Sequence, residues 1–332
     1  MKVKITDVAK ECGVSIATVS HVINGTRYVS PETTQKVQDA IRKLGYQPDI
    51  GARNFKKGRK GLIALLVPDI STSRSATIFK QLDEVLSAAG FHLIVANTNR
   101  DPEKEREQLK ILCSGVVDGV VLFTACKRFS QLSPAIPRDF PLVFIDTPLN
   151  DILYPSLLIS SYTALYQGVE DLIRQGHTRI GYICDQVDLA YSAERLDAYR
   201  TAIRDFGLDL GEELVVYSDR KTHGAHVCAK ELMEKGCTAI AVSNNQSATD
   251  AMKYLSGARL QLGRDVELLG LSGNDWYEYR TESIARVSQP VKEMARMAGQ
   301  QLLEQIEAGV PAQPRTTVLH SSYIPKHKKE DA

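Results

Sequence analysis

The residues whose types and spacing point to a specific chemistry lie between Thr6 and Asn24. Helical periodicity places Ile16, Ala17, Ser20 and His21 on one exposed face of a short helix. Imidazole and hydroxyl groups on such a face can hydrogen-bond to base edges when the helix enters a DNA major groove. The stretch therefore indicates contact with DNA, provided that flanking elements hold this helix in place.

Two short helices that meet at a tight turn would provide this support. Thr6 is a good N-cap for the first helix, and Gly13 supplies a left-handed turn. Ser15 caps a second helix that runs to Asn24, and Gly25 ends it. The apolar residues that can form a shared core are Val8, Ala9, Val14, Val19, Val22 and Ile23. This pattern is typical of a helix-turn-helix, although an ordinary helical hairpin would look the same in sequence.

The distribution of charge favours a nucleic-acid partner. The 332-residue chain has a net charge of +1, but residues 1–60 hold 12 basic and 5 acidic side chains. Such asymmetry indicates a head that binds a polyanion, attached to an acidic body. A solvated run of charge is the alternative. Binding to DNA phosphates through these side chains would weaken strongly with added salt.

Composition and motifs exclude several classes of protein. We find no apolar run near the roughly 20 residues of a membrane helix, and the N-terminus lacks a secretory apolar region. The six cysteines form no C-x-x-C pair, so we expect reduced thiols in a cytoplasmic protein. His223, His226 and Cys228 lack a second ligand cluster, so we expect no metal. No nucleotide-binding glycine motif or nucleophile elbow is present, which argues against a cofactor and an enzyme.

The remaining chain predicts a third helix, a linker and an α/β body. Ser30 and Pro31 open a helix that ends at Gly45, and a basic, glycine-bearing linker follows. Buried strands are then expected at 62–67, 93–96, 119–123, 142–146, 180–184, 214–217, 239–242 and 267–271. Helices are expected between them at 75–89, 102–114, 162–175, 192–206, 224–235, 247–258 and 291–308. This alternation predicts doubly wound parallel sheets, and the strand number favours two lobes with a ligand crevice between them.

The sequence resembles the LacI/GalR family of bacterial repressors over essentially its whole length, and its head is most similar to the purine repressor branch. The matches include 5–9 (ITDVA), 13–15 (GVS), 17–20 (ATVS), 22–25 (VING), 44–48 (LGYQP), 67–71 (VPDIS), 176–180 (GHTRI) and 288–290 (SQP). The resemblance implies an all-α helix-turn-helix domain at 1–46 and a hinge at 47–60. It also implies a periplasmic-binding-protein-like core at 61–332 that binds an effector and dimerises. The implied function is a ligand-responsive, sequence-specific transcriptional repressor.

For the head and hinge, the resemblance implies a homodimer on a pseudo-palindromic operator in double-stranded DNA. Base edges would be contacted by Ile16, Ala17 and His21. The other implied DNA-binding residues are Thr6, Ser15, Thr18, Ser20, Asn24, Tyr28, Arg53, Asn54 and Lys56. Phe55 stands where the family inserts a leucine wedge into the minor groove; packing of Phe55 against the core is the alternative. The C-terminal residues 324–332 carry no leucine heptads, so no tetramerisation tail is expected.

The implied effector crevice departs from the family pattern. Arg74 and Ser75 replace aromatics, and Ser160, Ser272 and Asn245 replace aspartates; Arg195 is retained and Arg220 is new. Buried arginines require anions, so we expect a small anionic effector, either a sugar acid or a sugar phosphate, and control of sugar-acid catabolism genes. Tyr191 and Trp276 would supply an apolar wall. The alternatives are pairing of Arg74 or Arg220 with Asp146 or Asp275, a purine or neutral-sugar effector, and an effector-independent DNA-binding protein.

Overall fold

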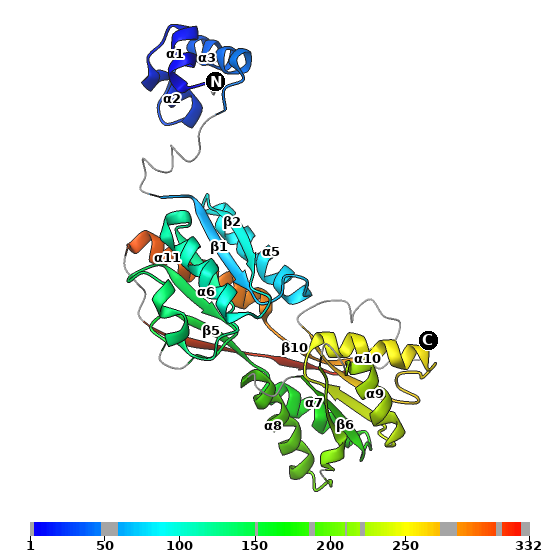
Figure 1. The fold of residues 1–332 in the computed structure, drawn as a ribbon. Coiled ribbons are helices and arrows are strands. Elements are labelled where there is room, and N and C mark those ends of the chain that lie inside the picture. The colour runs from blue at the N-terminus through cyan, green and yellow to red at the C-terminus, as the bar shows by residue number, and fades with distance from the viewer. Residues whose placement is uncertain are drawn as a thin grey trace. The chain divides into compact units, whose positions relative to one another are not determined.

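The computed structural model of the chain (Figure 1) describes residues 3–47, 59–149, 152–185, 190–209, 211–219, 223–272, 284–309 and 314–326. The chain forms two compact units, residues 1–60 and residues 61–332. The first unit is helical, and the second contains two parallel-sheet α/β lobes. The predicted fold class is therefore confirmed.

The head consists of α1 (Ile5–Cys12), α2 (Ile16–Asn24) and α3 (Pro31–Leu44). Val8, Val19 and Val37, one from each helix, have no exposed surface and form the centre of its small core. Ser15 caps α2 as predicted, since its hydroxyl accepts the Thr18 N–H at 3.1 Å. Each helix ends at a glycine with left-handed backbone, a conformation that costs glycine little.

The predicted N-cap at Thr6 is wrong. Helix α1 begins at Ile5, and Thr6 is an exposed residue of its first turn. The reason is Asp7, whose carboxylate accepts the Lys4 N–H at 2.8 Å and lies at the positive end of the helix dipole. This bond from the Lys4 N–H to Asp7 stabilises an earlier start than a Thr6 hydroxyl would.

The N-terminal lobe has the sheet order β11-β5-β4-β3-β1-β2, with every pairing parallel. The strands are β1 (Leu62–Val67), β2 (His92–Asn97), β3 (Gly119–Leu122), β4 (Leu142–Ile145), β5 (Ser156–Ser160) and β11 (Thr316–His320). Alternate residues of β1 bury themselves on opposite faces. One face packs against α5 (Ser73–Ala88) and α11 (Val291–Ala308), and the other against α6 (Pro102–Ile111).

The C-terminal lobe repeats this arrangement with the order β12-β10-β9-β8-β6-β7. Its strands are β6 (Ile180–Cys184), β7 (Val215–Tyr217), β8 (Ala239–Val242), β9 (Glu267–Ser272), β10 (Ala285–Ser288) and β12 (Ser322–Ile324). Only the pairing of β12 with β10 is antiparallel among the described strands. Helices α7 (Tyr162–Arg174) and α8 (Ala190–Asp205) cover one face, and α9 (Ala225–Glu234) and α10 (Asn245–Gly257) cover the other.

The chain crosses between the lobes after β5, after β10 and after β11 (Figure 1). Hydrogen bonds join the three crossings. The Ser161 and Ser321 hydroxyls lie 2.9 Å apart, and the Gln289 amide donates to Ser161 at 3.3 Å. Because Ser161 and Gln289 are buried, these bonds tie the lobes together away from competing water.

The strands that lie next to these crossings, β5, β10, β11 and β12, were not predicted from the sequence. They are short, and polar residues interrupt their apolar pattern, as in Thr316–His320 (TTVLH). The helix predicted at 102–114 also ends earlier, at Ile111, because the chain passes into a π-helical turn, Leu112–Val116. Gly115 closes that turn with φ of +105°.

Candidate DNA-binding face and effector crevice

The proposed reading helix α2 exposes the residues expected to meet bases. Ile16 is 49% exposed, Ala17 is exposed, and Ser20 and His21 are partly exposed, whereas Val19 on the opposite side is fully buried. Residues 12–31, which include α2 and its flanks, contain no acidic side chain. A helix face without carboxylates can approach DNA phosphates without charge repulsion.

Several polar side chains of this face are held by bonds within the head. The Ser15 and Thr18 hydroxyls lie 2.9 Å apart, and the Asn24 amide donates to the Ser20 carbonyl at 2.7 Å. Nδ1 of His21 lies 2.9 Å from the Thr26 hydroxyl. These contacts restrict rotamers, so the face is organised in the free protein. Tyr28 lies beyond α2 and is 86% exposed.

Some predicted site residues lie outside the described part of the chain. They are Arg53, Asn54, Phe55 and Lys56 of the hinge and Arg220, Asp275 and Trp276 of the core. Ser272 ends β9, but its side chain is also outside the description. The roles of these residues remain predictions.

Arg74, on the first turn of α5, is paired within its own lobe. Its Nη2 lies 2.6 Å from Oδ2 of Asp146, which follows β4, and its Nη1 donates to Oε1 of Gln289 at 2.7 Å. Asp146 has φ of +61°, a left-handed conformation that aspartate tolerates better than most residues. Arg74 thus makes the ion pair with Asp146 that the sequence left open as an alternative. The neighbouring Ser75 is buried, and its hydroxyl donates to the Asp69 carbonyl at 2.6 Å.

Arg195, on α8, lies in a different environment. It is only 5% exposed, and its Nη1 donates to the Ser243 carbonyl at 2.8 Å. The Tyr191 ring stacks on the guanidinium at 4.9 Å, while the buried Nε has no hydrogen-bond partner. Among the described residues, no carboxylate lies within ion-pair distance of Arg195, and burial lowers the pKa of its guanidinium. A buried cation that contacts no carboxylate is a candidate partner for an anion.

Two other residues that were predicted to contact the effector form hydrogen bonds to side chains of the protein. The Ser160 hydroxyl donates to the Glu194 carboxylate, which also accepts the Tyr162 N–H at 3.2 Å. Asn245, the first residue of α10, donates to the Ser73 hydroxyl at 3.2 Å and so links the two lobes. These bonds hold the crevice walls in the observed arrangement.

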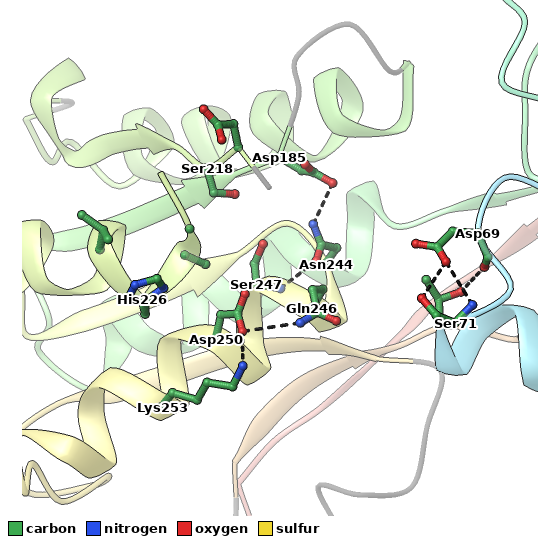
Figure 2. A pocket seen from close by; sticks show the side chains of 15 residues that line it. Asp69, Ser71, Asp185, Ser218, His226, Asn244, Gln246, Ser247, Asp250 and Lys253 are labelled. Carbon is green, nitrogen blue, oxygen red and sulfur yellow. Dashed lines mark hydrogen bonds and ion pairs between the residues drawn. The ribbon is translucent and has the colours of Figure 1, made fainter. Parts of the chain in front are cut away.

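A pocket of about 490 Å³ opens between the 69–72 loop of the N-terminal lobe and the strand ends of the C-terminal lobe (Figure 2). This volume suits a small ligand. Its polar lining comprises Asp69, Ser71, Thr72, Asp185, Ser218, Asp219, His226, Asn244, Gln246, Ser247, Asp250 and Lys253. Asn244 donates to Asp185 at 3.0 Å, and Lys253 to Asp250 at 2.8 Å. Arg195 does not line the pocket, but its acceptor Ser243 directly precedes the lining residue Asn244.

None of these lining residues is among the effector contacts predicted from the sequence. The signal that could have found them is position, because Asp185, Ser218 and Asn244 come within two residues of the ends of β6, β7 and β8. Carboxyl ends of parallel strands meet at one sheet edge, where α/β proteins bind ligands.

Comparisons with known proteins agree with this architecture. Residues 4–49 match the family of bacterial regulatory proteins of the lacI type, and residues 169–327 match a periplasmic binding protein-like domain. The chain is 29% identical over 323 residues to the HTH-type transcriptional regulator RegA of Clostridium saccharobutylicum, covering 96% of this chain and 97% of the relative. Residues 4–49 therefore belong to the lacI family of bacterial regulatory proteins, in a chain whose full-length relatives are transcription regulators.

Other LacI-family relatives extend the comparison. The HTH-type transcriptional repressor PurR of Vibrio atlanticus is 28% identical, with 91% of this chain and 92% of the relative covered. A solved CelR–cellobiose complex shares 25% identity and a TM-score of 0.69, with 98% and 99% covered. The lac repressor bound to ONPG, at 20% identity, has a TM-score of 0.82 over 98% of this chain and 99% of that chain, which shows the shared fold.

These relatives are transcription regulators, so the prediction of a DNA-binding regulator rather than an enzyme is confirmed. None of the described helices is both long and apolar enough to cross a membrane. Within the described ranges, no group of three or more His, Cys, Asp or Glu side chains is arranged to hold a metal ion.

Proposed function

We propose that this LacI-family protein is a homodimeric repressor that binds a pseudo-palindromic operator and responds to a sugar acid. In this proposal residues 1–46 read DNA, residues 47–60 form the hinge, and residues 61–332 bind the effector and dimerise. Lobe closure on the effector would change the operator affinity by an amount limited by the differential affinity of the effector for the two states.

The environment of the buried Arg195 is the main support for a sugar acid as the effector. A ligand carboxylate near its Nε would supply the contacting ion-pair partner that the described residues do not provide. The hydroxyls and carboxylates that line the adjacent pocket suit the hydroxyl groups of a sugar. Four aspartates in this lining oppose a ligand of higher negative charge, which favours a sugar acid over a sugar phosphate.

Relatives support a sugar-type ligand. Ribose operon repressors of Halalkalibacterium halodurans and Haemophilus influenzae match this chain at 29% and 27% identity. The CelR structure contains cellobiose. The purine repressors among the relatives represent the competing class of effector.

Calorimetry on the full chain tests the effector class with gluconate, glucuronate, glucose, glucose 6-phosphate and hypoxanthine. We expect a sugar acid to bind and the other classes to bind weakly or not at all. Arg195→Met should abolish sugar-acid binding, whereas Arg204→Met, an exposed arginine on the same helix, should leave it unchanged. Tight binding of glucose or hypoxanthine that persists in Arg195→Met would contradict the proposal.

The operator side is tested by sedimentation and by DNA binding. We expect a dimer at micromolar concentration, because two symmetry-related heads double the base contacts of one. Phe55→Ala should weaken operator binding and bending without changing the stability of the core. A monomer, or wild-type bending by Phe55→Ala, would contradict the dimer and the wedge respectively.

A further inference from the structure

His21 and Thr26 form a polar contact at the edge of the proposed reading face. His21 lies in the second turn of α2, and α2 ends at Gly25, whose φ of +62° turns the chain back. This turn brings the Thr26 hydroxyl to 2.9 Å from Nδ1 of His21. Nε2, on the other side of the ring, has no hydrogen-bond partner among the described residues and belongs to a partly exposed side chain.

The direction of this bond decides what the imidazole can recognise. In a neutral imidazole, one nitrogen donates and the other accepts. The Thr26 hydroxyl has one proton to donate, and within the described part of the chain Nδ1 is the acceptor recorded for it. If Thr26 donates to Nδ1, the ring proton resides on Nε2, and Nε2 is a donor.

We propose that Thr26 determines specificity by fixing His21 as a hydrogen-bond donor toward the base edge. This inference rests on the proposed function, in which α2 enters the major groove. A donor at Nε2 matches N7 of a purine, and guanine best, because O6 places a second acceptor on the same edge. It rejects the amino groups of adenine and cytosine, which need an acceptor. Thr26 is thus a positioning residue that acts through His21 without touching DNA bases.

The test begins with selection of operator sequences from a random DNA library by the full-length protein, followed by affinity measurements at each base pair. The variants are Thr26→Val, which removes the hydroxyl and keeps the shape, and Thr26→Ser, which restores it. Thr33→Val is the matched control, because Thr33 bonds to Ser30 at the start of α3 instead. His21→Ala identifies the base pair that His21 reads.

We expect Thr26→Val to lower the preference for a purine at that one base pair about three- to tenfold, the effect of one net hydrogen bond. Thr26→Ser and Thr33→Val should keep the wild-type preference. A 7-deazapurine at this position, which lacks N7, should weaken wild-type binding more than binding by Thr26→Val.

The outcomes separate this inference from the proposed function. If His21→Ala loses affinity at one base pair but Thr26→Val keeps the wild-type preference there, the role of Thr26 is refuted and base reading by α2 stands. The same conclusion follows if the 7-deazapurine has no effect on wild-type binding. If His21→Ala weakens binding equally to all sequences, His21 does not read a base and the role of Thr26 is refuted. A wild type that selects no preferred sequence would contradict base reading by α2 itself.

Discussion

Arg74 and Arg195 occupy comparable places in the two lobes but meet different partners. Arg74 lies on α5, which follows β1, and Arg195 lies on α8, which follows β6; β1 and β6 take the same place in the two sheet orders. Arg74 is neutralised by Asp146, whereas Arg195 has a backbone carbonyl and an aromatic ring. Burial alone therefore does not identify an arginine that binds a ligand. The groups that contact its guanidinium must be known as well.

The N-terminal lobe also buries an acid. Glu105 has no exposed surface, and its carboxylate accepts from the Thr124 hydroxyl and from the Ala125 N–H at 3.1 Å. Burial raises the pKa of Glu105, while these two bonds oppose that change. Both carboxylate oxygens have donors, so Glu105 braces the end of β3. In Arg195, by contrast, the buried Nε has no hydrogen-bond partner.

The largest effect is expected from breaking the ion pair of the N-terminal lobe. Arg74→Met should lower the free energy of unfolding by about 2–3 kcal/mol, because it leaves the nearly buried Asp146 carboxylate without its partner. Urea denaturation at pH 7 measures this. Adding Asp146→Asn should recover part of the loss, since asparagine removes the charge and tolerates φ of +61°. Equal stability of Arg74→Met and the double variant would show that the unpaired Asp146 charge is not the cause of the loss.

Substitution of one strand glycine in each lobe tests how tightly the two lobes are packed. A Cβ at Gly181 in β6 would lie 2.7 Å from Leu232, and one at Gly119 in β3 would lie 3.0 Å from Leu302. We expect Gly181→Ala to cost about 2 kcal/mol and Gly119→Ala about 1 kcal/mol, because overpacking forces side chains off their rotamers. Denaturation of both variants under one set of conditions measures the difference. The reverse order would mean that the C-terminal lobe accommodates volume more easily.

A smaller effect on stability is expected at Arg195. Arg195→Met should change the free energy of unfolding by less than about 1 kcal/mol, because the loss of one bond to Ser243 is offset by removal of a buried charge that has no carboxylate partner. The same denaturation assay applies. A loss as large as that of Arg74→Met would remove the distinction between the two arginines.

The smallest effect is a pH dependence at Glu105. Its folded-state pKa is raised, so the protonated form stabilises the fold below the ordinary pKa of 4.5, and this contribution is lost as pH rises through the folded-state pKa. The wild type should therefore lose stability relative to Glu105→Gln between pH 4.5 and 7.5. Exposed Glu107→Gln should show no such trend. A wild type that gains stability over Glu105→Gln across this range would contradict the sign.

Most elements could be predicted from local patterns. Ser15, Gly13 and Gly25 mark the ends of α1 and α2 because capping and left-handed turns depend on residues a few positions apart. Continuous apolar runs such as Leu62–Val67 predicted the central strands, since both faces of a parallel sheet are buried. The crossover-adjacent strands, such as β11, were missed because their burial comes from partners far away in the chain.

The sequence by itself therefore determined the helical head, the alternating strands and helices, and the polar positions at strand ends, because each depends on neighbours within a few residues. Only the tertiary structure decided which of those polar groups remain for a ligand. Arg74 forms an ion pair with Asp146, and Ser160 donates a hydrogen bond to Glu194. The buried Arg195 forms no ion pair with a carboxylate among the described residues. Such pairings join residues 34 to 72 positions apart, and their distances depend on how both sheets and all three crossings pack together.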